Sequence, residues 1–177
     1  MIGTAPFFLT INASVSANTL KEFVDYARAR PGQLNYGSAG NGTPPHVVME
    51  MFKSVTGLHL VHIAYKSPPI IALTTSDLHA MFDLPASFAV HARAGKVRQL
   101  AVASGTRHVD YPDVPTMAEA GVPGFEASAW FGLMAPRGTP REIAGRLNAE
   151  TNNALATKAL RDTLTNLGFD PAGNTPE

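Results

Sequence analysis

The residues best suited to chemistry gather in one glycine-rich stretch, residues 35–45, which reads NYGSAGNGTPP. Glycine permits positive φ angles and lets a ligand approach the backbone closely. We expect a short strand at 34–36 before the stretch and an amphipathic helix after it, with Thr43 as N-cap and Pro44 at the first helical position. The N–H groups of a first helical turn, together with the helix dipole, favour an anion. The pattern therefore predicts a seat for a carboxylate or a phosphate.

Nucleotide binding is the first alternative for this stretch. Gly37 to Gly42 matches the spacing G-x-x-x-x-G, but Thr43 stands where a P-loop carries the lysine that reaches the β- and γ-phosphates. Pro45 stands where the dinucleotide fingerprint has its third glycine. Both signatures are thus incomplete. A glycine-rich loop that binds nothing stays open as an interpretation at this point.

Ser38 lacks the sequence context of a catalytic serine. The nucleophile elbow requires G-x-S-x-G, and Tyr36 occupies the first glycine position. The sequence offers no clear histidine and acid partner, with only His46 and Asp83 as plausible members of such a pair. Ser38 and Thr43 are better interpreted as hydroxyl donors to an anion, or as turn and cap residues. We expect no catalytic residue and no enzyme.

The histidines do not form a metal-binding pattern. His59 and His62 are three residues apart in an expected strand, so they face opposite sides, and no carboxylate cluster accompanies them. The chain has no cysteine, which excludes thiolate metal sites and disulfides. We therefore expect no metal and no cofactor. His46, in the first turn of the helix that follows the glycine-rich stretch, is the histidine nearest the predicted seat.

Two further strand ends carry polar side chains. Asp83 ends an expected strand at 78–82; it could accept a hydrogen bond from a hydroxyl or an ammonium group, or cap the helix that follows. Tyr65 and Lys66 end the preceding strand, and Lys66 could either bring a positive charge to the seat or lie in solvent. In an open α/β sheet, ligands bind outside the carboxyl ends of the strands. These residues are therefore expected at the same edge as the glycine-rich stretch.

Length and charge restrict the function classes. A chain of 177 residues with 45% hydrophobic content suits one globular domain or two small ones. Fourteen basic residues balance fourteen acidic ones, so nucleic acid is not an expected partner. The longest apolar runs fall short of the roughly 18–20 residues that span a bilayer. The first residues lack the basic and apolar regions of a signal peptide.

Apolar periodicity predicts short strands alternating with helices. The expected strands are 7–11, 34–36, 58–65, 78–82, 97–103 and 125–135. The expected helices are 19–30, 44–56, 70–76, 87–94, 116–121, 139–155 and 158–167. Capping boxes that begin at Thr19, Thr116 and Thr139 open three of them. The alternation predicts an α/β fold with a largely parallel sheet.

Five motifs in order resemble the Bug family, the extracytoplasmic solute receptors of tripartite tricarboxylate transport systems. They are residues 34–43, 62–66, 81–83, 113–121 and 130–140, and the resemblance extends over nearly the whole chain. It implies a periplasmic-binding-protein-like fold of the type II, Venus-flytrap kind. It also implies that small carboxylates (di- or tricarboxylates, amino acids or aromatic acids) are passed to the membrane permease subunits of the transporter. The implied location is periplasmic, with cytoplasmic retention as the alternative for a chain without a signal peptide.

The resemblance also implies which residues bind the ligand. It assigns ligand contacts to the glycine-rich turn and to two strand ends: Ser38, Ala39, Gly40, Asn41, Gly42, Thr43, Tyr65 and Asp83. His46 and Lys66 join this set because they lie beside it in the sequence.

Departures from the family pattern shape the remaining expectations. One lobe, residues 12–127, is expected to be largely complete, while 1–11 and 128–177 would be the crossing strands and a remnant of a lobe that is mostly missing. Ser67 replaces a usual glycine, and Thr75-Ser76 replaces a frequent Gly-Gly pair. Half a site would bind weakly, and helices after Thr139 with uncovered apolar faces would promote self-association. The alternative function is a non-binding remnant or interaction module of the same fold.

Overall fold

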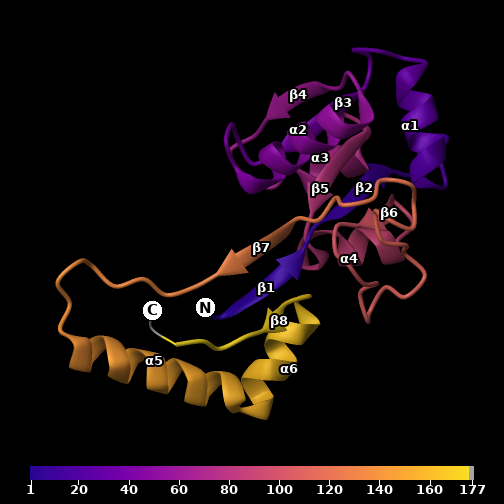
Figure 1. Cartoon of the computed structure of the whole chain (residues 1–177). Coiled ribbons are helices and arrows are strands. Elements are labelled where there is room, and N and C mark those ends of the chain that lie inside the picture. Colours follow the sequence, from indigo (N-terminus) through magenta and orange to yellow (C-terminus); the bar gives the residue numbers. More distant parts are fainter. Residues whose placement is uncertain (176–177) are drawn as a thin grey trace. The chain divides into compact units, whose positions relative to one another are not determined.

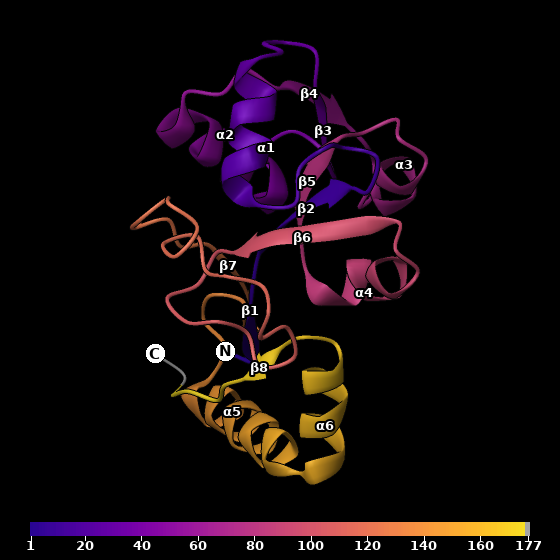
Figure 2. The same cartoon turned by 90° about the vertical axis from the view of Figure 1, so that its right-hand side faces the viewer.

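The computed structural model describes residues 1–175, which form two compact units (Figures 1 and 2). Unit 2 is the continuous segment Pro6–Ala127. Unit 1 consists of Met1–Ala5 and the residues from Ser128 on. None of the helices in residues 1–175 combines the length and the apolar character that a membrane span requires.

Unit 2 is built on a five-stranded sheet with the order β4-β3-β5-β2-β6. The strands are β2 (Phe8–Asn12), β3 (Asn35–Ser38), β4 (Val61–Ala64), β5 (Ala80–Asp83) and β6 (Val97–Val102). β3 pairs in parallel with β4 and β5, whereas β2 is antiparallel to β5 and β6. The sheet is thus largely parallel in strand direction, as predicted, with one exception. Four strands share one direction, but β2 runs against them, because the chain enters β2 at Phe8, opposite Asp83 at the end of β5.

Helices cover both faces of this sheet, and alternate residues of β5 pack against different helices. The helices are α1 (Leu20–Arg28), α2 (Pro44–Thr56), α3 (Ile70–Thr74) and α4 (Pro85–Arg93). Met81 belongs to a core cluster with Leu73 of α3 and Phe88 of α4. The next residue, Phe82, meets Phe52 of α2 with the ring centroids 5.9 Å apart. Strand side chains alternate between the two faces of a sheet, so both faces of β5 are buried.

The predicted capping box at Thr19 is confirmed. The Glu22 N–H donates to Thr19 Oγ1 at 3.2 Å, and Glu22 Oε2 accepts the N–H of Asn18 at 2.7 Å. Gly57 ends α2 with φ 67°, the left-handed conformation expected of a C-cap glycine. The start of α1 and the end of α2 thus follow from local hydrogen bonding and backbone conformation.

The second capping box forms without a helix. The Glu119 N–H donates to Thr116 Oγ1 at 3.1 Å, and the Thr116 N–H donates to Glu119 Oε2 at 2.8 Å. Residues 117–121 nevertheless form turns, so the predicted helix is wrong. Gly121 adopts φ 98°, which ends the turn after a single revolution.

Unit 1 contains the sheet β7-β1-β8 and two helices. The elements are β1 (Gly3–Pro6), β7 (Ser128–Phe131), α5 (Arg141–Ala156), α6 (Lys158–Asn166) and β8 (Asp170–Pro171). The strand predicted over 125–135 is confined to β7. Pro136 and Gly138, which has φ 88°, belong to the irregular segment that leads to α5.

The third predicted capping box is wrong. Thr139 Oγ1 donates to the carbonyl of Pro136 at 2.8 Å and caps no helical N–H. Pro140 occupies the N-cap position of α5 and not the first helical position. The predicted ends of α5 and α6 agree with the structure to within two residues.

Candidate functional site

The carboxyl ends of β3, β4 and β5 meet at one edge of the unit 2 sheet. Ser38 pairs in register with Ala64, and the Tyr65 N–H donates to the Ser38 carbonyl at 3.0 Å. A Cβ atom added at Gly40 would lie 3.4 Å from the Tyr65 carbonyl. The loop at 38–43 and the end of β4 are therefore in direct contact, and Asp83 ends the neighbouring strand on the other side of β3.

The loop between β3 and α2, residues 38–43, is held by side-chain hydrogen bonds. Gly40 and Gly42 adopt φ angles of 131° and 76°, which only glycine takes without strain. Thr43 Oγ1 donates to the Gly40 carbonyl at 2.7 Å. The Gly42 N–H donates to His46 Nδ1 at 3.1 Å. His46 thus fixes the loop from the first turn of α2.

Three backbone N–H groups at this loop are available to an acceptor. Those of Ala39, Asn41 and His46 donate to no atom of residues 1–175. Pro44 and Pro45 occupy the first two positions of α2 and have no N–H. Of the three free N–H groups, one therefore lies in the first turn of α2 and two lie in the glycine-rich loop.

The hydroxyl groups of Ser38 and Thr43 serve the fold. Ser38 is fully buried, its Oγ lies 3.0 Å from the Gly40 carbonyl and it accepts the Gly40 N–H at 3.1 Å. Ser38 Oγ also lies 2.7 Å from His62 Nε2. The predicted donation from these hydroxyls to an anion is thus replaced by bonds within the loop. A serine without exposed surface also cannot attack a substrate, although the structure does give it a histidine partner.

Asp83 is a buried carboxyl group with one unpartnered oxygen. It is 6% exposed, and Oδ1 accepts the N–H of Leu84 at 2.8 Å. Within residues 1–175, Asp83 Oδ2 has no hydrogen-bond partner, and neither has the nearby hydroxyl of Ser87. Burial raises the pKa of Asp83 to about 6. Leu84 is the N-cap of α4, so Asp83 precedes the cap position that the sequence allowed for it.

The two residues at the end of β4 differ in their surroundings. Tyr65 packs against the core cluster that contains Leu73. Lys66 is exposed, and its ammonium group makes no ion pair or hydrogen bond with residues 1–175. The chain therefore places an aromatic ring at this edge and leaves the neighbouring positive charge in solvent.

Sequence reasoning missed the side chains beneath the loop. His62 stacks on Tyr36 with ring centroids 4.7 Å apart, and the Tyr36 hydroxyl bonds Glu50 of α2. Glu50 also accepts from Lys53 Nζ at 2.6 Å. Burial would raise the pKa of Glu50, but the hydrogen bonds from Lys53 and Tyr36 lower it below its usual value. Only the β3–β4 register, which pairs Tyr36 with His62, could have indicated this cluster.

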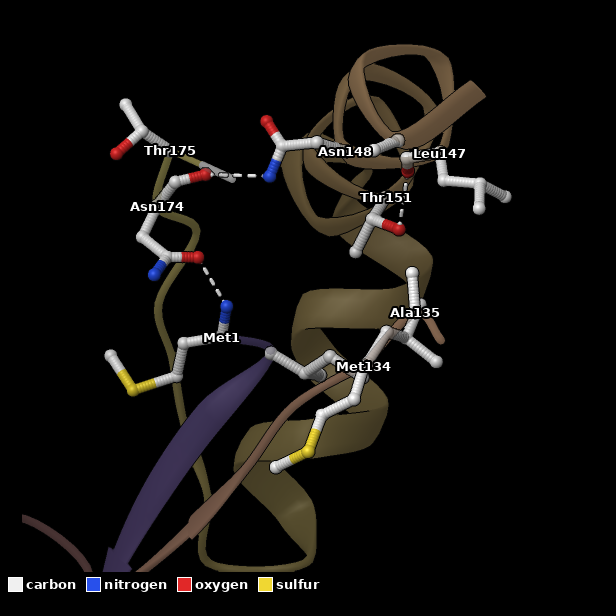
Figure 3. Close-up of a pocket in the computed structure, with 11 residues that line it drawn as sticks. Met1, Met134, Ala135, Leu147, Asn148, Thr151, Asn174 and Thr175 are labelled. Atoms are coloured by element: carbon white, nitrogen blue, oxygen red, sulfur yellow. Dashed lines mark hydrogen bonds between the residues drawn. The ribbon is translucent and has the colours of Figure 1, made fainter. Parts of the chain in front are cut away.

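A cavity of about 310 Å³ lies elsewhere, in unit 1 (Figure 3). Its walls include Met1, Met134 and Leu147, and none of the predicted site residues lines it. Asn148 Nδ2 donates to the Asn174 carbonyl at 2.8 Å on one side. Within residues 1–175, no group of three histidine, aspartate or glutamate side chains is close enough together to hold a metal ion.

Comparison with known proteins finds one family. The model of the tripartite tricarboxylate transporter family receptor, TctC, matches residues 1–176. The UPF0065 protein in the tcbD-tcbE intergenic region of Pseudomonas sp. (strain P51) is 37% identical over all of this chain and 54% of its own length. Protein BugT of Bordetella pertussis is 34% identical over all of this chain and 55% of its own length. The chain thus spans about half the length of the curated relatives it matches.

Solved structures share the fold. The structure of R. palustris Rpa4515 with adipate is 34% identical, with a TM-score of 0.93, and the match covers 99% of this chain and 59% of that one. The expected periplasmic-binding-protein-like α/β fold and the resemblance to the Bug proteins are both confirmed.

Proposed function

Because the chain belongs to the tripartite tricarboxylate transporter receptor family, we propose that its unit 2 binds a small carboxylate at the carboxyl edge of the sheet. The observation that carries the proposal is the set of unused backbone N–H groups at Ala39 and Asn41, on the loop that follows β3, and at His46, in the first turn of α2. Hydrogen bonds from N–H groups to a carboxylate are charge-assisted and are stronger than neutral ones. The loop needs no side-chain positive charge for this role, which agrees with the solvent-exposed position of Lys66.

Asp83 is the second polar contact in the proposal. Its unpartnered Oδ2, at the end of the strand beside β3, is buried, so it can accept a hydrogen bond from a hydroxyl or ammonium group of the ligand only when the residues that cover it shift. Below a pH of about 6 the same group, protonated, can donate to a ligand oxygen. Tyr65 places its backbone carbonyl beside the loop at Gly40, while its ring packs against the core cluster that contains Leu73. These contacts suit a carboxylate whose far end is polar.

The role of the whole protein is also part of the proposal. We infer that unit 2 is one lobe of a two-lobed receptor and that unit 1 carries the crossing strands and a remnant of the other lobe. The ligand would be delivered to the membrane permease subunits of the transporter, from a periplasmic location. Catalysis has no part in this role, since the family is one of transport receptors.

Calorimetric titration of the chain with adipate tests the proposal. We expect binding that is lost with adipamide, the neutral diamide of the same length, because an amide carries no charge for the loop N–H groups to stabilise. Gly40→Ala should weaken adipate binding about tenfold or more, since Gly40 has φ 131°, a conformation that alanine adopts only with strain. Gly95→Ala is the matched control: Gly95 has φ 68° and open space around it, away from the loop.

Equal heats for adipate and adipamide, or equal affinities in the two glycine variants, would contradict carboxylate binding at this loop. No binding of any small dicarboxylate would favour the alternative, a non-binding interaction module of the same fold.

Self-association through unit 1 completes the proposal. Leu133, Met134, Ile143 and Leu147 each expose half or more of their surface. Contiguous exposed apolar patches of this kind often mark interaction sites. Light scattering across a concentration series is expected to give a mass above 18.8 kDa, and Ile143→Ser with Leu147→Ser should lower it. A constant monomer mass would contradict this part.

A further inference from the structure

Ser38 Oγ joins the glycine-rich loop to His62 through hydrogen bonds that one protonation state of His62 satisfies together. A hydroxyl has one proton to donate and two lone pairs to accept with. Ser38 Oγ has three partners: the Gly40 carbonyl at 3.0 Å, the Gly40 N–H at 3.1 Å and His62 Nε2 at 2.7 Å. The Gly40 carbonyl can only accept a hydrogen bond from Ser38, and the Gly40 N–H can only donate one to it. All three bonds are therefore satisfied when His62 carries its hydrogen on Nε2 and donates it to Ser38.

His62 also belongs to a cluster of three rings from three elements, stacked on Tyr36 and tilted against His46. Its ring centroid lies 4.7 Å from that of Tyr36 on β3 and 4.2 Å from that of His46 on α2. Tyr36 is fully buried, and its hydroxyl is held by Glu50. The stack is thus anchored at its base in the core of unit 2.

The two histidines reach the loop at both of its glycines. His62 acts on Gly40 through Ser38, and His46 accepts the Gly42 N–H at 3.1 Å. Asn41 lies between these two fixed points, and Ala39 lies between Ser38 and Gly40. The N–H groups of Ala39 and Asn41 are those assigned above to the carboxylate. The direction in which they point therefore depends on the histidine stack.

We propose that His62 is a positioning residue for the carboxylate loop: through Ser38 and the neighbouring ring of His46 it holds Gly40 and Gly42, and so aims the N–H groups of Ala39 and Asn41. This inference rests on the proposed function for its effect on binding. The structural part of the inference, that His62 holds the loop in place, depends only on contacts within the ligand-free chain. Burial, followed by the neighbouring His46, lowers the pKa of His62, which favours the neutral ring.

Amide hydrogen exchange of the ligand-free chain, read by NMR, tests the structural part. His62→Phe keeps a ring for the stack and removes the N–H to Ser38, so exchange at Gly40 should accelerate about tenfold. His62→Gln places an amide N–H near the position of Nε2 and should restore slow exchange. His59→Phe is the matched control, an exposed histidine just outside the same strand, and should leave Gly40 unchanged.

Adipate titration of the same variants tests the functional part. We expect His62→Phe to weaken binding about tenfold, with His62→Gln and His59→Phe within about twofold of the unaltered chain. Core amides of β5 report whether each variant folds. If His62→Phe does not fold, Ser38→Ala replaces it, with the same acceleration expected at Gly40.

The outcomes separate this inference from the proposed function. Unchanged exchange at Gly40 in both His62→Phe and Ser38→Ala would overturn the positioning role, whatever the affinity for adipate. Faster exchange in a chain that binds no adipate would support the positioning role and refute the carboxylate function instead.

Discussion

The two units of this chain are both built of helices and strands but bury very different amounts of apolar surface. All the largest fully buried side chains, among them Phe8, Tyr36 and Phe82, belong to unit 2. In the described part of unit 1, Ala5 and Leu155 are the buried hydrophobic residues, while Trp130 is 59% exposed and Met134 79% exposed.

This difference in burial shows that a segment can form helices without gaining much stability from packing. The residues of α5 and α6 have the periodicity and composition of helices, and they form helices. Most helical stability in proteins nevertheless comes from packing of an apolar face. Burial of apolar surface contributes about 25 cal/mol per Å². Unit 1 buries few apolar side chains, so it gains little stability from this source. We therefore expect unit 2 to be the stable unit and unit 1 the one that opens first.

The largest expected effect comes from truncating a core ring. Phe82 is fully buried against Phe52 and Phe125, so Phe82→Ala should lower the free energy of unfolding of unit 2 by about 3–5 kcal/mol. Ile143→Ala in unit 1, at a position 51% exposed, should change stability by no more than about 0.5 kcal/mol.

Denaturation followed by two intrinsic probes measures both variants. Trp130, the sole tryptophan, reports on unit 1, and all four tyrosines lie in unit 2. Equal losses in the two variants would break the contrast between the units.

A charge buried in unit 2 should give the next effect. The pKa of Asp83 is raised from its usual 3.8 to about 6 by burial, so the folded state binds more protons than the unfolded state between these pH values. Its contribution to stability is therefore present at pH 4 and is lost as the pH rises through 6. Asp83→Asn should stabilise unit 2 at pH 7 by about 1–3 kcal/mol and change little at pH 4.

Urea denaturation at the two pH values checks this prediction. Asp113→Asn, at an exposed position without hydrogen bonds to residues 1–175, is the control and should have no effect at either pH. A gain from Asp83→Asn that is the same at pH 4 and pH 7 would show that burial of the charge is not its cause.

The smallest expected effect is the difference in stability lost when the threonine before α1 or the threonine before α5 is replaced by alanine. Thr19 accepts the Glu22 N–H, so Thr19→Ala should cost about 1 kcal/mol in unit 2. Thr139 caps no N–H of α5, so Thr139→Ala should cost less than about 0.5 kcal/mol in unit 1. Thermal unfolding read by the tyrosine and tryptophan signals distinguishes them, and an equal cost would mean that Thr139 caps α5 in solution.

Local signals predicted most elements of unit 2. The Thr19 box and Gly57 mark helix ends through bonds within a few residues, which a sequence displays directly. The capping box predicted at Thr139 does not form, because the Thr139 hydroxyl donates to the carbonyl of Pro136 and does not cap α5. Ser76 adopts φ 69° at a position where the family often has glycine, so the departure noted in the sequence coincides with an unfavourable backbone conformation.

The edge of the sheet that carries the candidate site residues was predicted in outline, and the contacts among them depend on strand register. The loop at 38–43 and the strand ends could be placed at one edge because parallel strands end together. The partnership of Ser38 with His62 could not, since it depends on which residues of β3 and β4 face each other. That the first turn of α2 has few free N–H groups could be predicted from the sequence, because it places two consecutive prolines, which have no N–H, at the start of the helix.

The backbone bonds at the two ends of unit 2 have a practical consequence. The Phe7 N–H donates to the Ala127 carbonyl at 3.1 Å, so the segment starts and finishes at one point. A continuous segment with adjoining ends can be inserted into a surface loop of a host protein without stretching either partner. Residues 6–127 could therefore be spliced into a fluorescent reporter, where ordering of the glycine-rich loop would be converted into an optical signal.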